Sequence, residues 1–206
     1  MKHSLNLPNR ITVARLGLAI VFFVLVGQYS HRAPRPWLLD LAAATFVIAA
    51  ISDILDGYIA RKRGLVTPFG RILDPLVDKI LVCGAFILFV GTGFVDADGH
   101  NVTEVRTWMV VVIVGRELLV TGLRGFNESM GKAFGASLHG KIKMWMQSVA
   151  APAILLIVAH EGTWFSVDKA QTMKITLAWL TVVVTAVSMG QYLMRSRYIL
   201  EEGTLS

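Results

Sequence analysis

Four aspartates lie within 26 residues of a chain that is otherwise strongly apolar. Asp53 and Asp56 are three residues apart, and Asp74 and Asp78 are four residues apart. On helices, either spacing places both members of a pair on one face, about one turn from each other. Two antiparallel helices joined by a short loop would then direct all four carboxylates into one space. Carboxylates can share such a space only if positive charge lies between them, and oxygen ligands favour Mg²⁺ or Mn²⁺ over zinc. The spacing therefore predicts a divalent-metal site for a substrate that carries phosphates.

Small residues and one arginine are interspersed with these acids. Glycine inside a helix costs about 1 kcal/mol relative to alanine, so Gly57 and Gly70, together with Ala60, need a reason to be there. Room for a flat base or a pyrophosphate against the backbone is the reason that we favour. Arg61, one turn beyond Gly57, can form a bidentate pair with a phosphate. The segment therefore predicts a pocket for a nucleotide or another phosphate compound.

The alternative for this charged segment is a solvated loop in which the acids pair with the neighbouring basic residues. We adopt that alternative for Lys62 and Arg63, which only fix the topology of the chain. For the four aspartates we favour the metal site, because ionisable groups at the ends of membrane segments are usually functional.

The composition is that of a membrane protein. The 206 residues are 54% hydrophobic and 17% charged, with a mean hydropathy of +0.60, whereas soluble domains carry about a quarter charged residues. The net charge of +6 is divided among short connections rather than arranged as a stripe, so it does not indicate nucleic-acid binding. The single cysteine, Cys83, excludes a cysteine-based metal cluster. We expect one domain over residues 1–206.

Six apolar segments follow one another along the chain, so we predict an all-α polytopic membrane protein with six transmembrane helices. A short interfacial segment containing Pro8 precedes the first helix. The six segments are Ile11–Gly27, Trp37–Ala60, Ile72–Val95, Val105–Phe126, Lys143–Ala159 and Met173–Met194.

The basic residues predict the orientation. With six spans, fifteen of the twenty Lys and Arg residues lie on the side that holds both termini and the charged segment. The positive-inside rule makes this side cytoplasmic. We therefore expect a multi-pass protein of the cell (inner) membrane whose site faces the cytoplasm.

Written out, the charged segment is Asp53-x-x-Asp56-Gly57-x-x-Ala60-Arg61, eight residues, then Gly70-x-x-x-Asp74-x-x-x-Asp78. This pattern resembles the signature of the CDP-alcohol phosphatidyltransferase family. Three further stretches are similar to the bacterial phosphatidylglycerophosphate synthase branch of that family. They are NLPNRITVARL near the N-terminus, GRELLVTGLR from Gly115 to Arg124, and GKIKMWMQ from Gly140 to Gln147.

The resemblance implies a six-helix membrane fold, usually a homodimer, with a site open to the cytoplasm and to the lipid. It implies that Asp53, Asp56 and Asp74 ligate one or two divalent cations, with two expected. Asp78 would also lie at the metals and serve as general base. The residues implied to line the pocket for the CDP moiety are Gly57, Ala60, Arg61 and Gly70.

The expected reaction transfers the phosphatidyl group of CDP-diacylglycerol to sn-glycerol 3-phosphate, giving phosphatidylglycerophosphate and CMP. An acceptor that is itself a phosphate needs a second cationic pocket. The candidates for it are Arg116, Arg124, Lys141 and Lys143, with Glu117 orienting Arg116 through a salt bridge. Topology or contact with anionic lipids is the other interpretation of these cations. Met144 stands where this branch commonly has threonine, which bears on the acceptor.

Other functions stay open on the sequence alone. The same chemistry could use another acceptor, as in a cardiolipin, phosphatidylserine or phosphatidylinositol phosphate synthase. A divalent-cation transporter or a purely structural membrane subunit are alternatives of other classes. Outside the charged segment, Asp96 to His100 is interpreted as an outer turn rather than a calcium loop. Residues interpreted as interfacial anchors are Trp37, Trp108, Trp164 and Tyr192.

Overall fold

The computed structural model describes residues 7–63, 68–129 and 138–203, with side chains at 11–55, 76–126, 140 and 142–194. Over these ranges the chain forms six α-helices and one short 3-10 helix, and it contains no strand, so the predicted all-α class is confirmed. The elements are α1 (Leu7–Gly27), α2 (Pro36–Arg63), α3 (Pro68–Phe89), η1 (Thr92–Phe94), α4 (Thr107–Ser129), α5 (Leu138–Ala159) and α6 (Val167–Gly203).

Each predicted apolar segment falls on one helix, but the bounds differ. Helix α6 begins six residues before and ends nine residues after its predicted segment, and α3 ends before the third segment does. That segment was expected to continue to Val95, but α3 ends at Phe89. The loop that follows α1 packs here, because the amide of His31 donates to the carbonyl of Gly93 at 2.8 Å. A Cβ at Gly93 would lie 2.5 Å from the carbonyl oxygen of Tyr29. Close backbone contact therefore replaces the last turn that hydropathy predicted.

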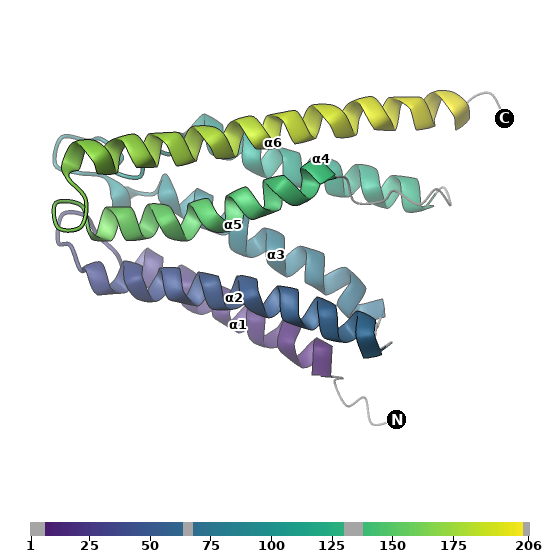
Figure 1. Ribbon diagram of the computed structural model, residues 1–206, viewed down its shortest axis with the longest axis horizontal. Helices are drawn as coiled ribbons and strands as arrows, with labels where there is room; N and C mark the ends of the chain where they lie inside the picture. The colour runs from purple at the N-terminus through teal and green to yellow at the C-terminus, as the bar shows by residue number, and fades with distance from the viewer. Residues whose placement is uncertain (1–6, 64–67, 130–137, 204–206) are drawn as a thin grey trace.

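The helices run lengthwise as a bundle (Figure 1). Three connections, residues 28–35, 90–106 and 160–166, lie together at one end, which we call the loop end. The start of α1 and the end of α6 lie at the opposite end, which we call the termini end. Helix α1 packs against α2 and α3, while α5 packs against α2 and α6, and α4 packs against α6. Consecutive helices run in opposite directions between the two ends, as six consecutive spans would.

Aromatic side chains fill the contact between the first three helices. Phe22 of α1 and Phe46 of α2 are fully buried and meet edge to face at 5.5 Å between ring centroids. Phe86 and Phe89 of α3 make the same kind of contact at 5.6 Å. Small residues such as Ala42 let the helices approach. These rings hold α1, α2 and α3 together along the part of the bundle that lies between the charged segment and the loop end.

The surface of the bundle is suited to lipid. Large apolar side chains such as Ile20, Val111 and Leu118 are more than half exposed. Among the described residues, three stretches are long and apolar enough to span a membrane, namely Pro36–Leu55, Ile142–Ala159 and Val167–Met194. The shorter apolar stretch Ile11–Gly27 lies on α1. The protein is therefore a membrane protein, and the number of spans stays a prediction.

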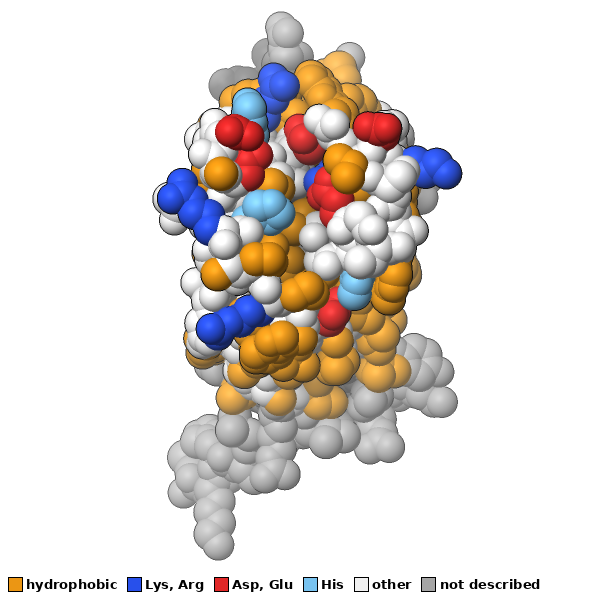
Figure 2. Space-filling model, turned by 90° about the vertical axis from the view of Figure 1, so that its left-hand side faces the viewer, with side chains coloured by type: hydrophobic (Ala, Val, Ile, Leu, Met, Phe, Trp, Pro, Cys, Tyr) orange, Lys and Arg blue, Asp and Glu red, His pale blue; other side chains and the backbone are white. Residues whose placement is uncertain are grey.

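The loop end is polar. Figure 2 shows Lys, Arg, Asp, Glu and His side chains gathered there, with hydrophobic side chains along the flank below. Trp37, Trp108 and Trp164 are exposed, as expected of anchors at a membrane surface. The prediction for Tyr192 is wrong, because its side chain is buried and contacts two arginines.

Candidate active site

The charged segment forms the facing parts of two consecutive helices. Asp53 lies in the second half of α2, and Asp78 lies at the middle of α3. All other positions of the signature also fall on these two helices, as predicted; they are Asp56, Gly57, Ala60 and Arg61 on α2, and Gly70 and Asp74 on α3. The side chains of these six residues lie outside the described part of the chain. Their assigned roles therefore stay predictions.

Asp53 and Asp78 lie close together on either side of one buried cation. Nη1 of Arg15 is 2.5 Å from Oδ1 of Asp53 and 2.9 Å from Oδ1 of Asp78. A single nitrogen thus contacts carboxylates from two helices, so the predicted convergence of α2 and α3 is confirmed for this pair. Each carboxylate keeps about a quarter to a third of its side-chain surface exposed, whereas the Arg15 side chain has none.

Arg15 comes from α1; in the sequence it was counted among the positive charges of the cytoplasmic side and lies in the stretch NLPNRITVARL, with no role at the site assigned to it. Its side chain is instead wholly enclosed by the first three helices. A signal for this was present, because Arg15 lies inside the apolar stretch Ile11–Gly27, where a charge is costly without a partner. What the sequence did not supply was the identity of that partner.

The donor set here fits a hard divalent cation. Only carboxylate oxygens are offered by Asp53 and Asp78, and both already lie within reach of one positive group. Carboxylate oxygens are the usual protein ligands of Mg²⁺ and Mn²⁺. The observed convergence therefore supports the predicted metal site, in which Asp53 and Asp78 would act as ligands.

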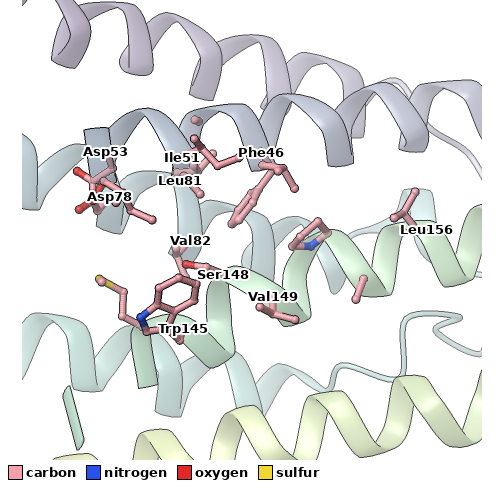
Figure 3. A pocket seen from close by; sticks show the side chains of 17 residues that line it. Phe46, Ile51, Asp53, Asp78, Leu81, Val82, Trp145, Ser148, Val149 and Leu156 are labelled. Carbon is pink, nitrogen blue, oxygen red and sulfur yellow. The ribbon is translucent and has the colours of Figure 1, made fainter. Parts of the chain in front are cut away.

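A cavity of about 960 Å³ begins at these two carboxylates. It lies between α2, α3 and α5, and Figure 3 shows Asp53 and Asp78 at one end and Leu156 at the other. Apart from the two acids, its lining is mostly apolar, with Phe46 and Leu81 on the inside. The lining residues that are also exposed on the side of the bundle are Val47, Ile51, Ile54, Met144, Trp145 and Val149. The cavity thus opens sideways between α2 and α5, onto the surface that faces lipid.

A second charged group, which we call the cation cluster, lies between α3, α4, α5 and α6. Three of the four predicted acceptor residues belong to it, and Lys79 is an addition that the sequence analysis missed. The cluster consists of Lys79, Arg116, Arg124 and Lys143. The fourth predicted residue, Lys141, has its side chain outside the described residues.

Glu117 is the carboxylate at the centre of the cation cluster. Its Oε1 accepts from Nη1 of Arg116 at 3.2 Å and also from Nζ of Lys143. All three side chains are almost completely buried. The predicted salt bridge between Glu117 and Arg116 is therefore confirmed, and Lys143 shares it.

Helix α6 supplies the remaining partners of the two arginines. Nη2 of Arg116 donates to Oγ of Ser188 at 2.8 Å, and its guanidinium lies 5.4 Å from the centre of the Tyr192 ring. Nη2 of Arg124 donates to the hydroxyl of Tyr192 at 3.3 Å. Within the described part of the chain, the buried Nε atoms of both arginines have no hydrogen-bond partner. The cluster thus combines an excess of positive charge with unused donors, as expected of an anion site.

Lys79 connects the cation cluster to the carboxylates. It follows Asp78 on α3, and its Nζ donates to Oγ1 of Thr121 on α4. Thr121 in turn donates to the backbone carbonyl of Glu117 at 2.6 Å. The proposed metal ligand Asp78 and the cation Lys79 are therefore consecutive residues of α3, so the carboxylates and the cation cluster lie next to each other.

The loop end contains its own polar cluster, away from these groups. Asp96 Oδ1 accepts the amides of Asp98 and His100 at 2.9 and 2.8 Å, which closes the predicted outer turn. The His100 hydrogen bond is the main reason that the pKa of the Asp96 carboxyl lies below its usual value. Ligand atoms of Asp96, Asp98 and His100 lie within 4.8 Å of one another. Nearby, burial raises the pKa of Tyr29 to about 12, with a further contribution from the charge of Glu161.

The sequence matches a known family over nearly its whole length. The model of the CDP-alcohol phosphatidyltransferases covers residues 5–195. The chain belongs to this family. The resemblance inferred from the signature is thereby confirmed, and Asp53 and Asp78 are the two signature aspartates whose side chains the structure describes.

Relatives within the CDP-alcohol phosphatidyltransferases are similar from end to end. A protein of Bacillus subtilis is 37% identical over an alignment of 203 residues, which covers 93% of this chain and 95% of the relative. A protein of Rickettsia felis is 32% identical, covering 89% and 93%, and one of Shigella flexneri is 32% identical, covering 93% and 95%. All three carry the name CDP-diacylglycerol–glycerol-3-phosphate 3-phosphatidyltransferase.

Proposed function

We propose that this protein transfers the phosphatidyl group of CDP-diacylglycerol to sn-glycerol 3-phosphate, releasing CMP and leaving phosphatidylglycerophosphate in the membrane. The observation that carries the proposal is the position of Asp53 and Asp78 at one end of an apolar cavity that opens toward lipid. A substrate that suits both parts has hydrocarbon chains at one end and phosphates at the other. The names of the relatives supply the donor and the acceptor.

The cavity would hold the donor lipid. Its apolar walls on α2 and α5 suit an acyl chain, which places the headgroup of CDP-diacylglycerol beside Asp53 and Asp78. The cytidine and its phosphates would then lie along the two signature helices. The residues proposed to line that part are Gly57, Ala60, Arg61 and Gly70.

The proposed cofactor is a pair of divalent ions, either Mg²⁺ or Mn²⁺. The family is generally dependent on divalent metals. The residues that would hold the ions are Asp53, Asp56, Asp74 and Asp78. Bound there, the metal neutralises charge on the pyrophosphate and makes CMP a better leaving group.

Asp78 would accept a proton during the transfer. The primary hydroxyl oxygen of glycerol 3-phosphate forms a bond to the lipid-side phosphorus, while the bond from that phosphorus to the bridging oxygen breaks and its electrons leave with CMP. The hydroxyl proton passes to the carboxylate of Asp78. Its partner Arg15 lies 2.9 Å from this carboxylate as a fixed positive charge, and the carboxylate is itself a weak base. General-base catalysis of this kind contributes about 10²- to 10⁴-fold in rate.

The cation cluster would bind the phosphate of the acceptor. Arg116 and Lys143 share the single carboxylate of Glu117, and Arg124 contacts the hydroxyl of Tyr192, so the three cations keep positive charge for an anion. Lys141 is proposed as a further contact. A neutral acceptor such as serine or inositol has no need of this cluster, which favours glycerol 3-phosphate over those alternatives. Membership of a transferase family likewise favours an enzyme over a cation transporter.

The proposed setting is the inner membrane of a bacterial cell, crossed six times, with the site on the cytoplasmic side. The six antiparallel helices and the excess of basic residues toward the termini end support this topology. We further propose that residues 1–206 form one domain and that the protein acts as a homodimer. Crosslinking in native membranes would test the dimer.

CMP release by the purified protein tests the reaction. CDP-diacylglycerol is supplied with Mg²⁺ and, separately, with glycerol 3-phosphate, serine, inositol phosphate or phosphatidylglycerol. We expect release only with glycerol 3-phosphate, and we expect Asp78→Asn to reduce it by about 100-fold or more because the proton acceptor is lost. Release only with another acceptor would reassign the substrate.

The matched control is Asp40→Asn. Asp40 is on α2 as well, but it lies toward the loop end, where its Oδ1 is 2.8 Å from Nε2 of His160. We expect this variant to stay within about twofold of the wild-type rate, as is usual for substitutions away from a site. If Asp78→Asn were as active as Asp40→Asn, the role of Asp78 as base would be wrong.

A further inference from the structure

Arg15 lies behind Asp53 and Asp78, on the side of these carboxylates that faces away from the cavity. Both aspartates are among the described residues that line the cavity, and Arg15 is not. The Arg15 side chain is fully enclosed, while the two acids keep exposed surface. The guanidinium therefore contacts the carboxylates from inside the protein and leaves their cavity side accessible.

We propose that Arg15 is a positioning residue of the metal site, a permanent buried cation that holds Asp53 and Asp78 where they share a divalent ion. This inference rests on the proposed function, and it adds α1 to a site whose signature comes entirely from α2 and α3. Arg15 touches no substrate in this proposal and acts only through the two aspartates.

The electrostatics favour this role over a purely structural one. Two carboxylates that meet one nitrogen repel each other strongly in a partly buried site. A guanidinium is always charged, and its planar group of donors fixes the direction of the acceptors as well as their separation. One Nη1 contacts Oδ1 of both acids, so the same group offsets their repulsion and sets their relative position.

The packing of α1 holds the backbone at Arg15 in place. Arg15 lies one turn before Ala19 and two turns before Phe22, both fully buried against the neighbouring helices. Helix α1 makes extensive contact with both α2 and α3. The backbone of α1 is therefore held in place, and the enclosed Arg15 side chain extends from it to two ligands on different helices. Partners of metal ligands that are held in this way commonly affect metal affinity.

Mn²⁺ binding without substrate tests the proposal, because it does not depend on catalysis. Detergent-purified wild type, Arg15→Met and Arg15→Lys are titrated with Mn²⁺, and free ion is followed by electron paramagnetic resonance. We expect Arg15→Met to raise the Kd by about 10- to 100-fold, the usual cost of removing a partner that orients a ligand. Arg15→Lys keeps the charge without the planar donor group, so its Kd should lie between those of wild type and Arg15→Met.

Lys174→Met is the matched control. Lys174 on α6 is also buried, and its Nζ is 2.7 Å from Oε2 of Glu161 at the loop end. This variant therefore loses a buried ion pair of similar kind without touching the carboxylates. We expect lower thermal stability for it and a Kd for Mn²⁺ within about twofold of wild type.

A second measurement separates positioning from general loosening of the fold. At saturating Mn²⁺, Arg15→Met should keep a KM for CDP-diacylglycerol within about twofold and still show kcat lowered by at least about tenfold, because Asp78 is misplaced. Wild-type or tighter Mn²⁺ binding by Arg15→Met would overturn the proposal. If that variant does not fold, Arg15→Lys decides: binding weaker than wild type supports the proposal, and equal binding overturns it.

Failure of the proposed function gives a different pattern. If the wild type neither binds Mn²⁺ nor releases CMP, the metal-dependent transfer is wrong, and the inference on Arg15 is wrong with it. If the wild type does both and Arg15→Met binds Mn²⁺ equally well, the transfer stands and only the positioning role is refuted.

Discussion

Arg124 is the residue at which acceptor binding can be tested most cleanly. In the cation cluster its guanidinium donates to the hydroxyl of Tyr192, whereas Arg116 and Lys143 are both held by the buried carboxylate of Glu117. Replacing Arg124 therefore disturbs the buried ion pairs least. Its buried Nε makes no hydrogen bond to the described residues.

We expect Arg124→Gln to raise the KM for glycerol 3-phosphate by about tenfold, which corresponds to about 1.4 kcal/mol of lost binding. The KM for CDP-diacylglycerol should change by less than about twofold. Initial rates of CMP release at varied concentrations of each substrate measure both values.

Arg106→Gln is the control for this substitution. Arg106 is exposed and immediately precedes α4 at the loop end, whereas Arg124 lies near the other end of α4. The same change in charge is therefore made far from the cation cluster. It should leave both KM values unchanged. Equal effects of Arg124→Gln on the two substrates would remove Arg124 from the acceptor site.

At the scale of residues, the sequence predicted the groups that belong to a contiguous pattern. Asp53 and Asp78 follow from helical spacing, and Arg116 and Arg124 follow from charges placed in apolar stretches. Arg15 was missed because its partners are more than thirty residues away, and no spacing rule relates α1 to α2 and α3. Buried partners of this kind depend on packing, which hydropathy does not encode.

At the scale of elements, the end of α3 shows how one close approach sets a helix boundary. Hydropathy favours continuation to Val95, yet the carbonyl of Gly93 accepts the amide of His31 and its Cα faces the carbonyl of Tyr29. The contact ties the loop after α1 to the loop after α3. Local composition could not predict it, because both partners of the contact are backbone groups from distant parts of the sequence.

Gly93→Ala should destabilise the protein by about 1 to 3 kcal/mol, the usual cost of forcing extra volume into a packed position. The added Cβ would lie 2.5 Å from a backbone oxygen, which cannot move aside as a side chain can. Thermal unfolding in detergent, followed by the fluorescence of a thiol-reactive dye at Cys83, measures the effect.

Gly115→Ala provides the comparison for this element. Gly115 lies within α4, and a Cβ there has no atom within 4 Å among the described residues. Because alanine favours a helix over glycine, this variant should be as stable as the wild type or slightly more stable. Equal melting temperatures for the two variants would show that the contact at Gly93 does not define the end of α3.

At the scale of the whole molecule, the length of α6 indicates that the helix is longer than the hydrocarbon layer of the membrane. Its 37 residues correspond to about 55 Å of helix, whereas the hydrocarbon core is about 30 Å thick. Its apolar stretch, Val167–Met194, lies toward the loop end. The last turns of α6 therefore continue past the apolar layer at the termini end, on the side that the proposed topology assigns to the cytoplasm.

Reporter fusions test this orientation. Green fluorescent protein fused after Ser206 should fluoresce, and alkaline phosphatase fused after Asp98 in the outer turn should be active, because that enzyme folds only outside the cytoplasm. The reverse pattern would place the site on the outer side and contradict the positive-inside argument. The sequence predicted this orientation from charge alone, since the rule depends on loop charges and not on packing.

The sideways opening between α2 and α5 has a consequence for how the rate depends on concentration. A donor that enters from the bilayer, and a product that returns to it, never cross water. The effective concentration of CDP-diacylglycerol is then its mole fraction in the surrounding leaflet, and inert lipid dilutes it even when the amount per volume stays constant. Glycerol 3-phosphate arrives from solution and follows ordinary molarity. The enzyme is thus an interfacial catalyst. Its rate depends on the surface concentration of one substrate in the membrane and on the bulk concentration of the other in water.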